Sequence, residues 1–224
     1  MATRSAYTKE LNKLAGHVTA MGQAVVENVC ATGRAMAGAG TEPASEVIAG
    51  HRATSLLGRG VEDACMSLML LQQPLARDLR LVTAAFRAVS DLARIEEMAY
   101  QIALTVEEGA PAATSVVGRD LGELARRVAT MVARAMDAFD SEDVEAAEGV
   151  FAMDDGIDGL YDEVRQRIVD QIKSDGEFAP SAPELLTIAK YYERMGDHAQ
   201  SIADWAIFRS TGSYRGHSMG DAYE

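Results

Sequence analysis

The sequence predicts an all-α protein made of two tandem antiparallel three-helix bundles, which together form a six-helix pseudo-repeat. Alanine accounts for 38 of the 224 residues and proline for five, and alanine has the highest helix propensity while proline has the lowest. Between the few helix breakers, apolar residues recur every three or four positions, which is the period of an amphipathic helix. Hydrophobic residues make up 48% of the chain and charged residues 25%, as in folded rather than disordered proteins.

Five clusters of glycine, proline and polar residues divide the chain into six helical segments. The clusters lie at residues 38–43, 72–74, 108–111, 140–141 and 175–183. The segments between them have about 27 to 35 residues, which corresponds to about 40 to 50 Å of helix at a rise of 1.5 Å per residue. Helices of this length that are joined by short loops pack as antiparallel neighbours.

The residues at these breakers predict where the helices begin. Thr41 and Ser141 are suitable N-cap residues, because their side-chain oxygen can accept a hydrogen bond from a backbone N–H of the first turn. Pro74 suits the first position of the third helix, where no backbone donor is required. The stretch Ser181–Glu184 has the pattern of a capping box before the sixth helix.

A short internal repeat divides the six helices into two sets of three. Residues 94–103 and 194–203 are 100 positions apart and share four of their ten residues, and each stretch lies in the third helix of its set. Self-similarity at a fixed distance predicts tandem structural units. We therefore expect a first bundle at residues 1–110, a second bundle at residues 111–212, and a flexible, polar tail at residues 213–224.

The charge of the chain and the absence of long apolar segments exclude several classes of protein. The formal net charge is −13, whereas nucleic-acid binders and proteins held on anionic lipid depend on lysine and arginine. The first ten residues contain no apolar core of a signal peptide, and the longest uncharged apolar stretch, residues 64–76, is shorter than the roughly 20 residues of a membrane span. We expect a cytoplasmic protein that neither binds nucleic acid nor inserts into the membrane.

Two pairs of carboxylates at helical spacing are the most informative residues. Asp154 and Asp158 are four positions apart in the fifth helix, and Glu193 and Asp197 are four positions apart in the sixth, so each pair lies on one side of its helix. If these two helices are neighbours, the four residues, named here the acidic quartet, converge on one patch. Like charges repel unless a cation lies between them. The quartet therefore predicts a site for a divalent or trivalent metal ion, with Mg, Mn, Zn and Fe all left open.

Two other interpretations of the quartet remain open at this point. A solvated acidic face, which Asp162 and Asp204 would extend, makes the protein a metal-free helical scaffold. A metal-dependent bundle enzyme is the third interpretation, but no histidine lies three residues after a glutamate as in di-iron bundles. The sequence also lacks the common hydrolase and nucleotide-binding motifs. We therefore expect no catalytic residues.

Three stretches of the chain resemble the signature sequences of the PhoU family. They are Gln72–Arg80, Val150–Asp158 and Tyr192–Ala199, and the resemblance extends from about Tyr7 to Gly212 in the same six-helix order. It implies two three-helix bundles, often assembled as a homodimer, with metal bound at E(D)-x-x-x-D motifs. It also implies a cytoplasmic regulator of phosphate uptake that works with the ATPase of the phosphate ABC transporter and with the sensor kinase of the phosphate regulon.

The family's metal motifs match the two halves of the chain unequally. In the second half they coincide with the acidic quartet, Asp154, Asp158, Glu193 and Asp197. In the first half they fall on Ala93–Glu97 and His51–Ser55, where most of the acids are missing. We therefore expect one metal site at the quartet and no strong second site at His51, Glu96 and Glu97.

Overall fold

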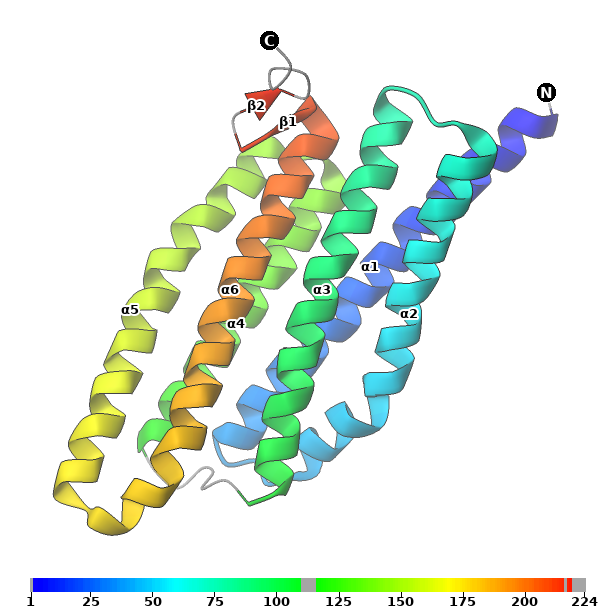
Figure 1. Cartoon of the computed structure of the whole chain (residues 1–224). Coiled ribbons are helices and arrows are strands. Elements are labelled where there is room, and N and C mark those ends of the chain that lie inside the picture. The colour runs from blue at the N-terminus through cyan, green and yellow to red at the C-terminus, as the bar shows by residue number, and fades with distance from the viewer. Residues whose placement is uncertain (1, 110–115, 216, 219–224) are drawn as a thin grey trace.

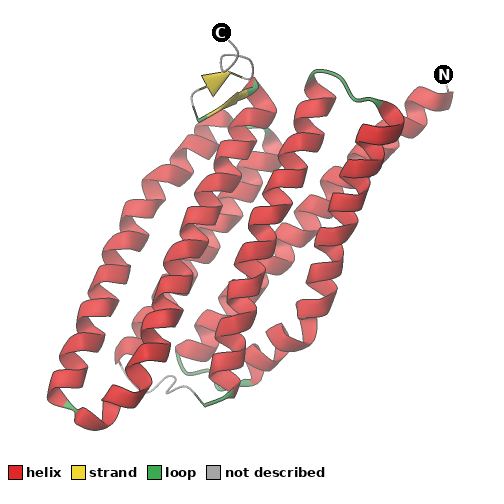
Figure 2. Ribbon diagram, viewed as in Figure 1, coloured by secondary structure: helices red, strands yellow, loops and turns green. Residues whose placement is uncertain are grey.

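The computed structural model describes residues 2–109, 116–215 and 217–218, and it consists almost entirely of long helices that run up and down one bundle (Figures 1 and 2). The helices are α1 (Ala2–Met36), α2 (Glu42–Gln72), α3 (Arg77–Glu107), α4 (Val116–Ser141), α5 (Val144–Ser174), the 3₁₀ helix η1 (Gly176–Ser181) and α6 (Ala182–Thr211). The prediction of an all-α protein with six principal helices is therefore confirmed.

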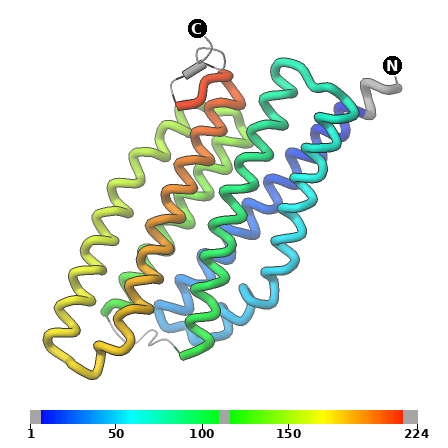
Figure 3. The backbone as a smooth tube through the Cα atoms, viewed as in Figure 1, coloured from blue at the N-terminus to red at the C-terminus, as the bar shows by residue number. Residues whose placement is uncertain are grey.

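The helices form two similar sets of three that share one hydrophobic core. In the first set α2 packs on α1 and α3, and in the second set α5 packs on α4 and α6. The two sets meet where α1 contacts α4 and where α3 contacts α6, so α1, α3, α4 and α6 are the inner helices and α2 and α5 the outer ones (Figure 3). These sets fall within the predicted units 1–110 and 111–212, but their buried side chains form one continuous cluster.

Small residues allow α1 and α4 to cross closely. A Cβ atom at Gly33 would lie 2.6 Å from the Cβ of Ala125, and one at Gly122 would lie 2.8 Å from the Cβ of Ala37. Both distances are too short for real atoms, so neither position can accept a larger residue without a shift of the helices.

Cys65 on α2 is buried, and its burial raises the pKa of the thiol to about 12, as expected of a small core residue.

Helix α5 begins later than predicted, because Asp143 rather than Ser141 is its N-cap. Asp143 Oδ1 accepts a hydrogen bond of 3.0 Å from the backbone N–H of Ala146. Ser141 Oγ instead donates to the carbonyl oxygen of Asp137, 2.7 Å away, within α4. The left-handed backbone of Glu142, with φ of 57°, separates the two helices.

Of the other three predicted helix starts, one lies at a different residue, and two lie where predicted but lack the expected side-chain cap. Helix α3 begins at Arg77 instead of Pro74, because Gln73 and Ala76 both have positive φ angles and interrupt the helix. Thr41 and Ser181 are N-cap residues, but neither side chain makes a capping hydrogen bond. At residues 181–184, where a capping box was predicted, η1 runs directly into α6, and the backbone N–H of Ala182 donates to the carbonyl oxygen of Ala179.

The first residues of the predicted flexible tail are ordered against α6. Gly212 ends α6 with a φ of 82°, and the chain then forms a small antiparallel pair of strands, β1 (Ser213–Tyr214) and β2 (His217–Ser218). The ring of Tyr214 stacks on Trp205 with centroids 4.2 Å apart. Residue 216 and residues 219–224, the rest of the predicted tail, lie outside the described residues. None of the described helices has both the length and the apolarity needed to cross a membrane.

Candidate functional site

The four predicted metal ligands lie along the contact between α5 and α6. Asp154 and Asp158 are on α5, and Glu193 and Asp197 are on α6, which packs against α5 (Figure 1). Asp154 and Glu193 are half-buried, whereas Asp158 and Asp197 are exposed. The side chains nearest the helix contact are therefore the ones that lose most of their hydration.

A glycine allows Asp154 to lie directly against the backbone of α6. Gly196 is buried, and a Cβ atom at that position would lie 3.4 Å from Asp154 Oδ1. Burial raises the pKa of Asp154, the charges of the other three quartet members raise it further, and a hydrogen bond with Gln200 opposes them. The other three carboxylates of the quartet thus lie within range of the charge of Asp154.

A lysine of the protein already neutralises part of this charge. Lys190 Nζ lies 2.6 Å from Glu193 Oε2 and 5.4 Å from the centre of the Tyr161 ring. Glu193 Oε2 is buried, and among the described residues no donor makes a hydrogen bond of good geometry to it, so its contact with Lys190 is an ion pair. The pairing with Glu193 raises the pKa of Lys190, so the ammonium group stays charged at the site.

The quartet has the chemistry of a metal site but not its closed geometry. Carboxylate oxygens are the donors that hard cations prefer. Among the described residues, however, no group of three or more His, Cys, Asp or Glu side chains is placed so that it could hold a metal ion. A metal at the quartet therefore requires side-chain rearrangement, including the release of Glu193 from Lys190.

The two aspartates expected to extend the acidic stripe form ion pairs elsewhere. Asp162 Oδ1 lies 3.2 Å from Arg165 Nη2 on the same helix. Asp204 Oδ2 accepts a hydrogen bond of 3.1 Å from Arg215 Nε, which lies after β1. Neither residue therefore adds an unpaired charge to the quartet.

His198, the neighbour of Asp197, faces the first set of helices. His198 Nδ1 lies 2.9 Å from Asp91 Oδ1 on α3, and Ser201 Oγ donates to Asp91 Oδ2 at 2.8 Å. The His198 ring is therefore paired with Asp91 across the contact between α3 and α6. Asp91 could not be found from the motif, because it is distant in sequence and has no helical acidic partner.

The first half contains a more buried polar cluster at the corresponding place. Glu96 on α3 is only 2% exposed, and it accepts a hydrogen bond of 2.8 Å from Asn28 Nδ2. His51 Nδ1 on α2 lies 3.2 Å from Glu96 Oε1, and His51 Nε2 lies 3.8 Å from Glu97 Oε2. The histidine ring also stacks on Tyr100 with centroids 4.0 Å apart. The sequence indicated all of these acids and His51, but not Asn28.

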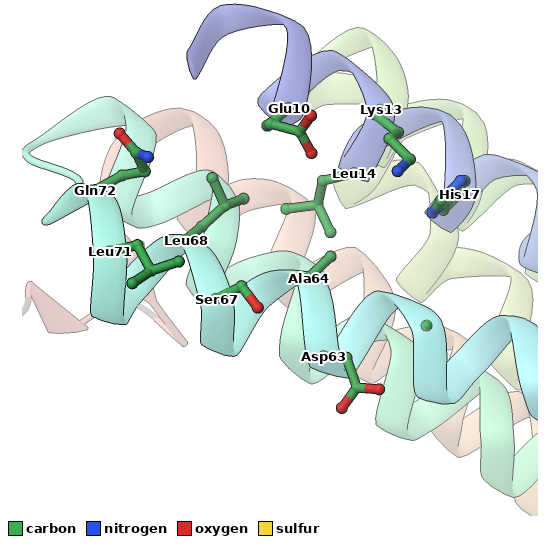
Figure 4. A pocket seen from close by; sticks show the side chains of 11 residues that line it. Glu10, Lys13, Leu14, His17, Asp63, Ala64, Ser67, Leu68, Leu71 and Gln72 are labelled. Atoms are coloured by element: carbon green, nitrogen blue, oxygen red, sulfur yellow. The ribbon is translucent and has the colours of Figure 1, made fainter. Parts of the chain in front are cut away.

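A groove between α1 and α2 is separate from both polar clusters. It has a volume of about 370 Å³, and Leu14, Leu68 and Leu71 form its apolar part, with Lys13 and Asp63 among the polar groups beside them (Figure 4). No predicted site residue lines it, and nothing in the structure shows what covers it.

Comparison with known proteins gives a match over both halves of the chain. The model of the PhoU domain family matches residues 18–106 and, a second time, residues 121–206. The two matches correspond to the two sets of three helices, which agrees with the internal repeat.

Relatives match over nearly the full length. The phosphate-specific transport system accessory protein PhoU of Serratia marcescens is 28% identical over 97% of this chain and 90% of its own. The homologue of that protein in Caulobacter vibrioides is 30% identical over 94% of this chain and 92% of its own.

The fold is also that of a solved relative. The crystal structure of PhoU from Pseudomonas aeruginosa superposes with a TM-score of 0.83 at 27% identity and covers 92% of this chain and 100% of that chain. The relatives are named as accessory proteins and not as enzymes, in agreement with the prediction that the chain is not an enzyme. The match of the family model across both halves and the full-length similarity show that this chain belongs to the PhoU family.

Proposed function

We propose that this chain is a cytoplasmic regulator of phosphate uptake. The observation that carries the proposal is the full-length similarity to proteins named accessory proteins of the phosphate-specific transport system. The chain would act as an adaptor, most simply as a homodimer, between the ATPase of the phosphate ABC transporter and the sensor kinase of the phosphate-starvation response. In this role it signals that phosphate is sufficient.

The regulatory role is tested by deleting the gene and measuring the phosphatase output of the phosphate regulon in phosphate-rich medium. We expect high output in the deletion strain and low output after the gene is restored. Unchanged output in the deletion strain would contradict the role. Co-purification of the tagged chain with the transporter ATPase and with the kinase, each tested alone, identifies the direct partner, and light scattering of the purified protein measures its oligomeric state.

We further propose that the acidic quartet binds a divalent or trivalent metal ion. The supporting observations are the four carboxylates on facing helices and the raised pKa of Asp154, which is caused by burial and then by repulsion from the other three carboxylates. The bound cation would remove this repulsion and tie α5 to α6. Such a cation makes the metal-loaded protein less acidic than its formal charge of −13.

The metal proposal is tested by titrating metal-free protein with Mn²⁺, Mg²⁺, Zn²⁺ and Fe³⁺ in a calorimeter. The informative variant is Asp154→Asn with Asp158→Asn, which should abolish binding. Asp162→Asn is a matched control on the same helix, because Asp162 is paired with Arg165 and should not contribute. Equal binding by the double variant and the wild type would contradict the site.

A metal-free scaffold is the second candidate, and one observation favours it. Within the described part of the chain no set of ligands closes around a metal, and Lys190 already supplies a cation to Glu193. In that case none of the four metals produces binding heat, while deletion of the gene still raises the phosphatase output. The two experiments therefore distinguish the regulatory role from the metal site.

A further inference from the structure

A polar cavity lies at one end of the inner helices and contains no member of the acidic quartet. The starts of α1 and α3 and the ends of α4 and α6 meet at this end of the bundle (Figure 1). The cavity has a volume of about 370 Å³, and its polar lining includes Tyr7, Asn12, Arg77, Asp78, Glu142 and Arg209. A volume of this size is in the range of small-molecule sites.

Arg209 is a buried cation that is held in one position by the core. Its side chain is only 10% exposed. One guanidinium nitrogen donates to the carbonyl oxygen of Phe139, and the guanidinium carbon lies 5.0 Å from the centre of the Phe139 ring. A buried charge without a counter-charge is strongly destabilising, so this end of the bundle requires an anion beside Arg209.

Glu142 supplies the carboxylate that contacts Arg209, and Asp140 adds a second negative charge nearby. The Oε1 atom of Glu142 lies 3.3 Å from Arg209 Nη2 and 2.8 Å from Arg77 Nη2, so two guanidinium groups converge on one oxygen. Arg77 is 73% exposed, and exposed ion pairs contribute at most about 1 kcal/mol. Glu142 also lies in a turn with a left-handed backbone, which is an unfavourable conformation for a residue other than glycine. An incoming anion that gives Arg209 a new counter-charge can replace this carboxylate, whereas loss of the carboxylate alone would leave the buried guanidinium without it.

Without Glu142, the two arginines of the lining outnumber its one remaining carboxylate. Asp78 keeps its negative charge near Arg77, and it accepts a hydrogen bond of 3.0 Å from the hydroxyl group of Tyr7. When Glu142 leaves, two guanidinium forks are without a full complement of acceptors. A phosphoryl group offers three acceptor oxygens and a charge of about −1.5 to −2, and planar guanidinium groups bind such oxygens in pairs.

We propose that Arg77 and Arg209 bind a phosphoryl oxyanion in this cavity and that Glu142 occupies its place in the unliganded protein. The ligand is either inorganic phosphate or the phosphoryl group of a phosphate ester, which present the same oxygens to the two arginines. This site goes beyond the proposed adaptor role and the quartet, and it does not depend on either. The local charge of this cavity, where two arginines line the wall, differs from the net charge of −13 of the whole chain.

The experiment is a calorimetric titration of the full-length protein with inorganic phosphate and, separately, with phosphoserine, against chloride at matched ionic strength. Glu142→Gln removes the competing charge and should tighten binding by about tenfold, while Arg77→Gln should weaken it by about tenfold, each equivalent to about 1.4 kcal/mol. Arg165→Gln is the control, because Arg165 is also exposed and paired with an acid but lies on α5. Arg209 is left unchanged, since loss of a buried cation can unfold the protein, and circular dichroism checks that each variant is folded.

The titrations distinguish free phosphate from a phosphate ester as the ligand, and they include results that would overturn the proposal. Binding of inorganic phosphate assigns the site to the free ion, and binding of phosphoserine alone assigns it to a phosphate ester. Absence of binding by both the wild type and Glu142→Gln, or equal affinity in the wild type, Glu142→Gln and Arg77→Gln, would overturn the proposal. A negative result here leaves the gene-deletion test unaffected, so the regulatory role and the anion site fail separately.

Discussion

The two halves of the molecule place different groups at the same position of the three-helix unit. In the second half Asp154 on α5 faces Gly196 on α6. A Cβ atom built at Gly196 would lie 3.4 Å from Asp154 Oδ1. In the first half His51 on α2 faces Glu96 on α3, with Nδ1 and Oε1 3.2 Å apart. Glu96 is 100 positions before Gly196, which is the spacing of the internal repeat.

The difference changes how each half neutralises its acids. In the first half the acid is deeply buried, and the histidine and Asn28 satisfy it within the protein. In the second half Gly196 leaves space for Asp154, and the charges of the other three quartet carboxylates act on it. Among the described residues, Lys190 is the one cation that forms an ion pair with the quartet. The buried acid of the first half is therefore paired within the protein, whereas the second half keeps carboxylate charge that the described residues pair only at Glu193.

The largest expected effect comes from removing the internal partner in the first half. His51→Ala leaves the buried Glu96 with Asn28 alone and also removes the stacking on Tyr100. Loss of one partner of a buried charged group costs about 2 kcal/mol, so we expect the free energy of unfolding in urea to fall by about that amount at pH 7. Glu96→Gln in the same background should recover part of the loss, because it removes the buried charge.

The effect of His51→Ala should also depend on pH. Burial raises the pKa of Glu96 above its ordinary value of 4.5, and contacts with Asn28 and His51 oppose that rise. Without the histidine, the carboxyl pKa rises further in the folded state, so the added cost is absent below about pH 4.5 and grows as the pH rises. A loss of stability that is the same at pH 4 and pH 7 would show that the ring's packing, and not its contact with Glu96, is responsible.

In the second half, replacing Asp154 by asparagine should raise the free energy of unfolding, by less than His51→Ala lowers it. The raised pKa of Asp154 means that the folded protein favours the neutral carboxyl. Its stability contribution is therefore present below the ordinary value of 3.8 and is lost as the pH rises through the raised folded value. Asp154→Asn mimics the neutral form and should stabilise metal-free protein at pH 7 by about 0.5 kcal/mol, a value reduced for solvent screening. Urea unfolding at pH 7 and pH 4 measures it, and a destabilisation at pH 7 would contradict it.

The fold was predictable from local properties of the sequence. The apolar spacing of helix α4 predicted its buried side, and residues such as Val117, Leu121 and Leu124 are all fully buried. The helix starts were less predictable, because Asp143 is a cap only where the turn at Glu142 places it. A local sequence pattern contains no information about such a turn.

The sites were predictable only in part. Spacing of four residues identified the quartet, since each pair is determined by one helix. It could not identify Lys190 as the partner of Glu193, or Arg209 as a buried cation beside Glu142, because these contacts depend on side-chain positions and on residues that are far apart in the sequence. Asn28 beside Glu96 is a third example, with 68 positions between the two residues.

The smallest effect on stability should come from replacing Lys190. The same variant best distinguishes neutralisation of Glu193 by the lysine from neutralisation by a bound metal ion. Lys190→Gln removes a partly exposed ion pair with Glu193, so the free energy of unfolding should change by only a few tenths of a kcal/mol. If metal binds the quartet, it competes with Lys190 for Glu193, and the variant should bind Mn²⁺ more tightly in a calorimetric titration. Lys173→Gln is the control, because Lys173 lies on α5, where it is paired with Asp170 and not with a member of the quartet. Equal affinity in the wild type and both variants would show that metal binding does not involve Glu193, and the asymmetry between the halves would then rest on the aspartates alone.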